Sequence, residues 1–162
     1  MSLKIAIVDD HNLVRKGISN LLTSRGYNVV AECSNGQEIL DILEKQDVDV
    51  VFMDLQMPLM DGRQATQTLT ERYPDVKVIA LSMFDDDSSI LKMIRAGARG
   101  YLLKDAEPEE LVRAINDVMN FGYHTSEYVS GKLVKSAFDG RSMEDELVET
   151  LTDRELEFLK LA

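Results

Sequence analysis

The sequence predicts an α/β protein with a parallel β-sheet that is covered by helices on both faces. Five short apolar runs alternate along the chain with segments of helical spacing, in the order (βα)5. Apolar residues follow one another within these runs, which is typical of strands that are buried on both sides of a parallel sheet. The predicted strands are 5–8, 29–31, 48–53, 76–81 and 101–103.

The crossover helices are predicted from apolar residues that recur three or four positions apart. This spacing is clearest around residues 13–22, 39–43, 90–94 and 111–119. Pro108 stands in the first turn of the last of these segments, where its missing N–H leaves no hydrogen bond unmade. Each predicted strand is therefore followed by a helix that can return the chain to the same end of the sheet.

Composition limits both the size and the partners of the protein. The chain of 162 residues with 44% apolar content can fill one core of ordinary size with an appendage, but not two full domains. Cys33 is the single cysteine, and no apolar stretch approaches the ~18 residues that a membrane span needs. We therefore expect a cytoplasmic protein without membrane contact. The net charge of -11 argues against direct binding of nucleic acid by these residues.

Polar side chains follow four of the predicted strands. Asp9 and Asp10 come after the first strand, Asp54 after the third, Ser82 after the fourth and Lys104 after the fifth. Parallel strands end at the same edge of a sheet, and ligands bind beyond that edge. We therefore expect these five side chains to form one site.

The residue types at this edge predict phosphoryl chemistry. Three carboxylates in one pocket repel one another, and unless one of them takes a proton they need a cation to stay ionised together. A hard divalent cation such as Mg²⁺, which prefers oxygen ligands, meets this need. A carboxylate beside Mg²⁺ can attack phosphorus and form an aspartyl phosphate, while an ammonium and a hydroxyl hold the phosphoryl oxygens. Asp54, Lys104 and Ser82 fit these three roles.

Several short motifs together resemble the receiver domain of two-component response regulators over about Lys4 to Phe121. They are Asp9-Asp10, the stretch from Met53 to Gly62, Ser82, and the stretch from Gly100 to Lys104. The resemblance implies a flavodoxin-like, doubly wound (βα)5 fold with strand order 2-1-3-4-5. It also implies that Asp54 is the phosphoacceptor and that a sensor histidine kinase or a small phosphodonor supplies the phosphoryl group.

The same resemblance implies a metal site and a switch. Mg²⁺ would be held by Asp10, Asp54 and the main-chain carbonyl of Gln56, with Asp9 helping directly or through water. Tyr101 would be the aromatic residue that turns inward when the serine at the end of the fourth strand engages the phosphoryl group. The alternative for Tyr101 is a half-buried strand tyrosine with its hydroxyl in water.

Three departures from the common receiver pattern bear on the phosphorylated state. Serine replaces the more frequent threonine at Ser82, Met83 stands where alanine is common, and Asp105 replaces a proline after the strand-end lysine. We expect Met83 to crowd the phosphoryl pocket. The lost proline leaves open whether a cis peptide bond follows Lys104.

Other candidate ligands have simpler interpretations. We interpret His11 as a residue at the start of the first helix without a chemical role, and the acidic run 85–87 as the start of the fourth helix, where it complements the helix dipole. Four methionines could suggest a soft metal site, but their apolar surroundings favour packing. They are Met53, Met57, Met60 and Met83.

The chain is predicted to divide into three parts. Residues 1–122 form the receiver, residues 123–149 a linker with a helix, and residues 150–162 resemble the first helix of a LuxR-type helix-turn-helix domain. A capping box at 152–155 opens that last helix. We interpret the chain as a truncated NarL/FixJ-class transcription regulator, which would contact DNA only through the missing part of its output domain. The apolar face of the last helix is expected to seek a partner, and a homodimer is a further expectation.

Three other functions are compatible with parts of this pattern. A small phosphatase of the haloacid dehalogenase type also uses an aspartyl nucleophile, but it needs a second Asp where this chain has Gln56. A flavodoxin-like nucleotide or flavin module would need a glycine-rich loop that is absent here. A receiver that acts without phosphorylation is the third. The receiver is expected to modify only itself, by phosphorylation and dephosphorylation of Asp54, and not to be an enzyme for other substrates.

Overall fold

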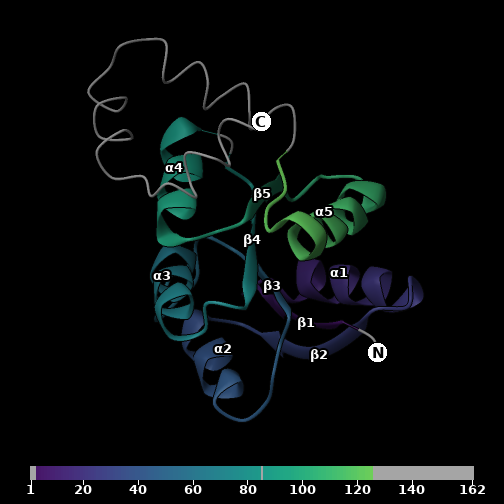
Figure 1. The fold of residues 1–162 in the computed structure, drawn as a ribbon, viewed down its shortest axis with the longest axis horizontal. Coiled ribbons are helices and arrows are strands. Elements are labelled where there is room, and N and C mark those ends of the chain that lie inside the picture. Colours follow the sequence, from purple (N-terminus) through teal and green to yellow (C-terminus); the bar gives the residue numbers. More distant parts are fainter. Residues whose placement is uncertain (1–2, 85, 126–162) are drawn as a thin grey trace.

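A computed structural model describes residues 3–84 and 86–125 of the chain, and in this part strands and helices alternate strictly (Figure 1). The elements are β1 (Lys4–Val8), α1 (Asn12–Ser24), β2 (Asn28–Cys33), α2 (Gly36–Leu43), β3 (Val50–Met53), α3 (Gly62–Arg72), β4 (Lys77–Ser82), α4 (Asp87–Ala96), β5 (Gly100–Leu103) and α5 (Pro108–Phe121). All strand pairs are parallel, and the strand order is β2-β1-β3-β4-β5. The predicted fold class and strand order are confirmed.

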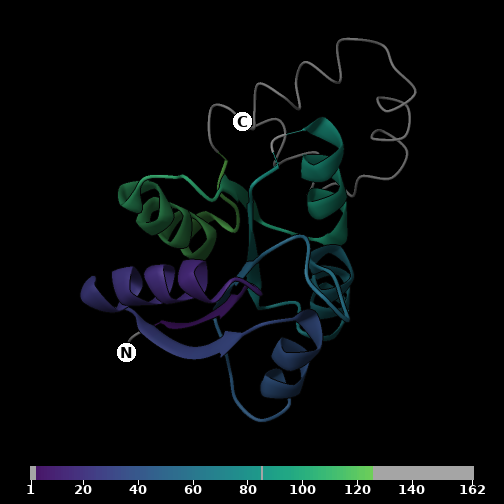
Figure 2. The ribbon, with the colours of Figure 1, turned by 180° about the vertical axis from the view of Figure 1, so that it is seen from behind.

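Helices cover both faces of the sheet. Helices α1 and α5 lie on one face, and α2, α3 and α4 lie on the other, as the two opposite views show (Figures 1 and 2). In β1, Ile5 and Ile7 pack into the apolar cluster under α1 and α5, whereas Ala6 and Val8 pack into the cluster under the other three helices. Because both faces of the strand are buried from Ile5 to Val8, these four positions are all apolar, which is why the strand appears in the sequence as a continuous apolar run.

The observed element boundaries differ from the predicted ones by up to three residues. Strand β3 begins at Val50, although the apolar run begins at Val48. Val48 is only 5% exposed, so it belongs to the core without belonging to the β-ladder. Burial alone therefore produced the apolar signal that extended the predicted strand.

Helix α3 has few apolar residues, and its buried face consists largely of small side chains. Gly62, Ala65 and Thr66 are buried there together with Leu69. The helix begins where the Asp61 side chain accepts a hydrogen bond from the backbone N–H of Gln64 at 2.8 Å. An N-cap of this kind satisfies one of the free N–H groups of the first turn and fixes the start of the helix directly after the β3 loop.

Helix α4 has the cap that the acidic run predicts. Asp86 accepts hydrogen bonds from the backbone N–H and the hydroxyl of Ser89, at 3.0 and 2.8 Å. These bonds hold the pKa of the Asp86 carboxyl below its usual value. The capping interpretation is confirmed for Asp86, while Asp85 lies outside the described residues.

The predicted linker helix within residues 123–149 and the predicted output helix at 150–162 lie outside the described residues, apart from residues 123–125. Within residues 3–84 and 86–125, no helix is both long enough and apolar enough to cross a membrane.

Gly62 fixes the distance between α3 and the end of β3. Its N–H donates to the carbonyl oxygen of Leu55 at 2.8 Å, and a Cβ at this position would lie 1.9 Å from the carbonyl oxygen of Asp54. Since backbone atoms cannot move away as a flexible side chain does, we predict that Gly62→Ala lowers the free energy of unfolding by about 3 kcal/mol or more.

Gly17→Ala is the matched control for this prediction. Gly17 lies within α1, and a Cβ there would meet no atom within 4 Å. Replacing a helical glycine in open space should raise the free energy of unfolding by about 0.5–1 kcal/mol. Urea unfolding of the two variants measures both effects, and equal changes in the two would contradict the close approach at Gly62.

Candidate functional site

The register of the sheet places two acidic residues side by side. Val8 of β1 pairs with Met53 of β3, and Asp9 and Asp54 follow them directly. The backbone remains tied at this point, because Asp54 N–H donates to Val8 O and Asp9 N–H donates to Cys33 O, both at 2.9 Å. The two carboxylates are therefore positioned by the sheet itself and not by a mobile loop.

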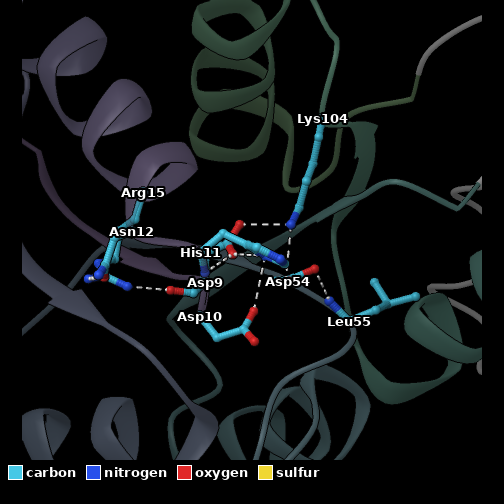
Figure 3. Close-up of polar contacts among 8 residues, drawn as sticks. All are labelled: Asp9, Asp10, His11, Asn12, Arg15, Asp54, Leu55 and Lys104. Atoms are coloured by element: carbon cyan, nitrogen blue, oxygen red, sulfur yellow. Dashed lines mark hydrogen bonds and ion pairs between the residues drawn. The ribbon is translucent and has the colours of Figure 1, made fainter.

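Lys104 directly follows the edge strand β5, and its side chain reaches these two carboxylates along the same end of the sheet. Its backbone N–H donates to Ser82 O at 2.8 Å, at the ends of β4 and β5. Its Nζ lies 2.9 Å from Oδ2 of Asp9 and 3.2 Å from Oδ2 of Asp54 (Figure 3). The side chains of Asp9, Asp54 and Lys104 are 2%, 6% and 10% exposed, so this ion-paired triad is shielded from water.

The triad has a distinctive protonation behaviour. Burial, followed by the negative charge of Asp9, raises the pKa of Asp54 to about 6. Lys104 and the Leu55 N–H, which donates to Asp54 Oδ1 at 2.8 Å, oppose this rise. Burial alone would lower the pKa of Lys104, but its hydrogen bond to Asp9 and the charge of Asp54 outweigh burial, and the pKa is raised. Near neutral pH the site therefore has an ammonium beside a carboxylate that is mostly ionised.

Above the triad, the surface opens into a pocket of about 500 Å³. The residues that line it come from the ends of β1, β3, β4 and β5 and the loops that follow them: Asp10, His11, Asp54, Gln56, Met57, Pro58, Met83, Phe84 and Lys104. Of the five side chains expected to form one site, Asp10, Asp54 and Lys104 line this pocket, and Asp9 lies directly against Lys104. Ser82 is fully buried and is not among the described residues that line the pocket.

Ser82 and Tyr101 are linked through one backbone segment beside this pocket. Ser82 is fully buried, and its Oγ accepts a hydrogen bond from Phe84 N–H at 3.0 Å. Tyr101 is 1% exposed, and its hydroxyl donates to Phe84 O at 2.5 Å. The alternative of a half-buried tyrosine with its hydroxyl in water is therefore wrong, because the hydroxyl has a protein acceptor in the interior.

The methionine interpretation holds for three residues and fails for one. Met53 is fully buried, and Met57 and Met60 pack against the core. Met83 is 74% exposed and lines the pocket, because the chain leaves the sheet at the end of β4. Among the described residues no peptide bond is cis, so the bond after Lys104 is trans.

Sequence reasoning missed a contact of His11. The residue stands at the N-cap position of α1, as expected, but its Nδ1 also lies 3.3 Å from Asp9 Oδ1 and 3.2 Å from Asp10 Oδ1. Phe84 was missed as well. The signal that could have found both is their position within two residues of a polar strand end, since such residues line the ligand edge of a parallel sheet.

The side chains present fit a divalent cation. Asp9, Asp10, His11 and Asp54 each offer one ligand atom, and these atoms lie within 4.8 Å of one another. The Lys104 ammonium is an ion-pair partner of the buried Oδ2 atoms of Asp9 and Asp54, and neither oxygen accepts a hydrogen bond of standard geometry within the described part of the chain. Clustered carboxylates with remaining acceptor capacity are typical of sites for hard cations.

A family model for the response regulator receiver domain matches residues 5–116, which include all of these site residues. The chain belongs to the response regulator receiver family. The chain is 38% identical over 134 residues to the transcriptional regulatory protein DegU of Brevibacillus brevis, a match that covers 82% of this chain and 57% of DegU. The chain thus spans little more than half the length of that relative.

Two further comparisons agree with this assignment. The nitrate/nitrite response regulator protein NarL of Escherichia coli K12 is 32% identical over 158 residues, which cover 97% of this chain and 73% of NarL. The crystal structure of a LuxR-family two-component response regulator from Aurantimonas sp. SI85-9A1 superimposes with a TM-score of 0.78 at 30% identity, covering 85% of this chain and 99% of that one. The expected kinship of the receiver with NarL and with LuxR-family response regulators is confirmed.

The raised pKa of Asp54 predicts that Asp54→Asn stabilises the metal-free receiver near neutral pH. The folded protein favours the protonated carboxyl more than the unfolded chain does, so the contribution of Asp54 to stability falls as pH rises from about 4 to about 6. The amide carries no charge, and it should raise the free energy of unfolding by about 1–3 kcal/mol above that window.

Urea unfolding in the presence of a chelator, near pH 7.5 and again near pH 4, measures this effect. The advantage of Asp54→Asn should be present at the higher pH and largely absent at the lower one. An advantage that does not change with pH, or a destabilisation at pH 7.5, would show that Asp54 is not an unfavourably buried charge.

Proposed function

We propose that this receiver accepts a phosphoryl group on Asp54 and that the modification gates an attached output domain. The observation that carries the proposal is the contact between the Asp54 carboxylate, buried at the end of β3, and the Lys104 ammonium at 3.2 Å. Asp10 lines the pocket above them, which is open to solvent, and the buried Asp9 carboxylate lies within 4.8 Å of the Asp10 and Asp54 carboxylates. A nucleophile, a fixed cation and a metal-binding group are therefore within reach of one incoming phosphoryl group.

In the proposed step, an oxygen of Asp54 attacks the phosphorus of the donor. The new O–P bond forms while the bond between phosphorus and the donor atom breaks, and the bonding electrons leave with the donor. The donor would be the phosphohistidine of a sensor histidine kinase or a small acyl phosphate. The Lys104 ammonium, already ordered by two ion pairs, would face the phosphoryl oxygens and stabilise their charge without further rearrangement.

The residues that would hold the metal ion are Asp10, Asp54 and the main-chain carbonyl of Gln56, with Asp9 contributing directly or through water. Mg²⁺ bound there would neutralise charge on the carboxylates and on the phosphoryl group. Burial, followed by the charge of Asp9, raises the pKa of Asp54, and a cation bound there would oppose both effects.

The structure also suggests how a phosphoryl group would be sensed. The Ser82 hydroxyl, which now accepts from Phe84 N–H, would turn to donate to a phosphoryl oxygen. Such a turn would alter the backbone segment that also holds the Tyr101 hydroxyl through Phe84 O. Phosphorylation would thereby shift a conformational equilibrium whose two states differ from the pocket to the surface of α4 and β5.

The output is proposed from the relatives and the sequence pattern. DegU is named a transcriptional regulatory protein and NarL a response regulator. By analogy, residues 123–149 would link the receiver to a DNA-binding domain that begins at 150–162, and a homodimer would present two such domains to DNA. A cytoplasmic location remains a prediction of the sequence.

A phosphatase function is the weaker candidate. A haloacid dehalogenase needs a second aspartate as a general acid and base at the position of Gln56. Gln56 cannot take that role, so repeated turnover of a substrate is not favoured. Multiple turnover of a phosphate ester would support that alternative.

The test is to incubate the full chain with acetyl phosphate and Mg²⁺ and to measure the intact mass. We expect the wild type to gain one phosphoryl group and Asp54→Asn to gain none. Asp47→Asn is the control, because Asp47 is an exposed carboxylate in the segment that precedes β3, at the opposite end of that strand. It should be labelled like the wild type.

A chelator should abolish the labelling, because the carboxylates then repel the donor. Equal labelling of Asp54→Asn and wild type would reject Asp54 as the acceptor. Labelling that survives complete removal of divalent ions would reject the proposed role of the metal.

A further inference from the structure

The chain contains two histidines, and they lie in opposite environments. His124 is 3% exposed, and its Nδ1 lies 2.7 Å from Asp117 Oδ2. The ring of His11 is 62% exposed at the mouth of the acidic pocket. Only His11 is therefore available to a solute that enters this pocket.

His11 and Lys104 contact different carboxylate oxygens. Nδ1 of His11 lies near Oδ1 of Asp9 and Oδ1 of Asp10, whereas the ammonium lies against Oδ2 of Asp9 and Oδ2 of Asp54. Figure 3 shows the imidazole and the ammonium at separate contacts on this carboxylate cluster. An ion bound beside the imidazole would therefore not have to displace the lysine from the same oxygens.

The spacing of these atoms fits a small first-row metal ion. A tetrahedral ion with bonds of about 2.0–2.1 Å to nitrogen and oxygen has its ligand atoms about 3.3 Å apart, and an octahedral ion has adjacent ligand atoms about 2.9 Å apart. The observed separations from Nδ1 to the two carboxylate oxygens are 3.3 and 3.2 Å. The backbone N–H of His11 also donates to Asp9 Oδ1 at 2.9 Å, which holds this carboxylate oxygen beside the backbone of His11.

An imidazole changes the ion that such a site prefers. Mg²⁺ favours oxygen ligands alone, whereas Zn²⁺ and Cu²⁺ gain strongly from nitrogen and stand at the high end of the affinity order for divalent first-row metals. A pocket with one nitrogen and several carboxylate oxygens would bind these ions more tightly than an all-oxygen pocket of equal charge.

We propose that His11 is a metal ligand and that, with Asp9 and Asp10, it makes the acidic pocket a site for Zn²⁺ or Cu²⁺ in addition to Mg²⁺. This inference goes beyond the proposed phosphorylation, and it does not depend on phosphorylation taking place. Its consequence is that a late first-row ion would compete with Mg²⁺ for the same carboxylates and hold the receiver in a state without Mg²⁺.

Pulsed electron paramagnetic resonance of the full chain with one equivalent of Cu²⁺, near pH 7.5, tests the ligand directly. The remote nitrogen of a coordinated imidazole gives a characteristic modulation, and only two residues of this chain can supply it. We expect the modulation in the wild type and its loss in His11→Ala. His124→Gln is the matched control and should retain it.

The location of the ion is tested with Asp10→Asn, which should weaken Cu²⁺ binding together with the imidazole signal. Modulation that is undiminished in Asp10→Asn would mean that a lone surface imidazole holds an adventitious ion only, and it would overturn the proposal. The absence of imidazole modulation from the wild type, or its persistence in His11→Ala, would also overturn it.

A second experiment measures how strongly the site prefers Zn²⁺ to Mg²⁺. Competition with a chromophoric chelator gives the affinity for Zn²⁺, and the same protein is titrated with Mg²⁺. In His11→Ala the ratio of the Zn²⁺ affinity to the Mg²⁺ affinity should fall at least about tenfold, as loss of a ligand requires. An unchanged ratio would contradict the role of His11. None of these readouts involves phosphorylation, so failure here is distinguishable from failure to label Asp54.

Discussion

Two buried carboxylates that share one ammonium are the constraint around which this receiver is organised. Asp9 and Asp54 are almost completely removed from water, and each would be costly as an isolated charge. Lys104 offsets part of that cost through ion pairs of 2.9 and 3.2 Å, but it supplies one positive charge for two negative ones. Burial, followed by the charge of Asp9, raises the pKa of Asp54, and the excess negative charge is the physical reason that the site favours a further cation.

The strand order and register of the sheet bring the two carboxylates together. Parallel strands in the order β2-β1-β3-β4-β5 end at one edge, and the pairing of Val8 with Met53 leaves Asp9 and Asp54 adjacent. Gly62 then lets α3 begin against the carbonyl of Asp54. Backbone hydrogen bonds thus hold the main chain of both acidic residues on the sheet, so their repulsion is not relieved by a shift of the backbone.

Sequence reasoning could predict the sheet and the residues at its polar edge, because both follow from rules about backbone geometry. Continuous apolar runs identify strands buried on two faces, and parallel strands bring Asp9, Asp54 and Lys104 to one end. Strand limits were less accurate where a buried residue such as Val48 lies outside the ladder. The division of the chain after residue 122 stays a prediction, since the residues from 126 onward lie outside the described part.

Loop paths and side-chain rotamers could not be predicted from the sequence pattern. The contact of His11 with two carboxylates depends on which way its ring turns at the N-cap of α1. The exposure of Met83 and the burial of the Tyr101 hydroxyl against Phe84 O depend on the path of the chain after β4. No periodicity encodes that path, because it is set by packing against neighbouring elements.

The most direct test of the central claim is the chemical identification of the residue that forms the acyl phosphate. Borohydride reduces an aspartyl phosphate to homoserine, with release of phosphate, and peptide mass spectrometry then locates the altered residue. This account predicts homoserine at position 54 in wild-type protein that was exposed to a phosphodonor and Mg²⁺, with Asp9 and Asp10 unchanged. Homoserine at position 9 or 10, with Asp54 intact, would contradict it.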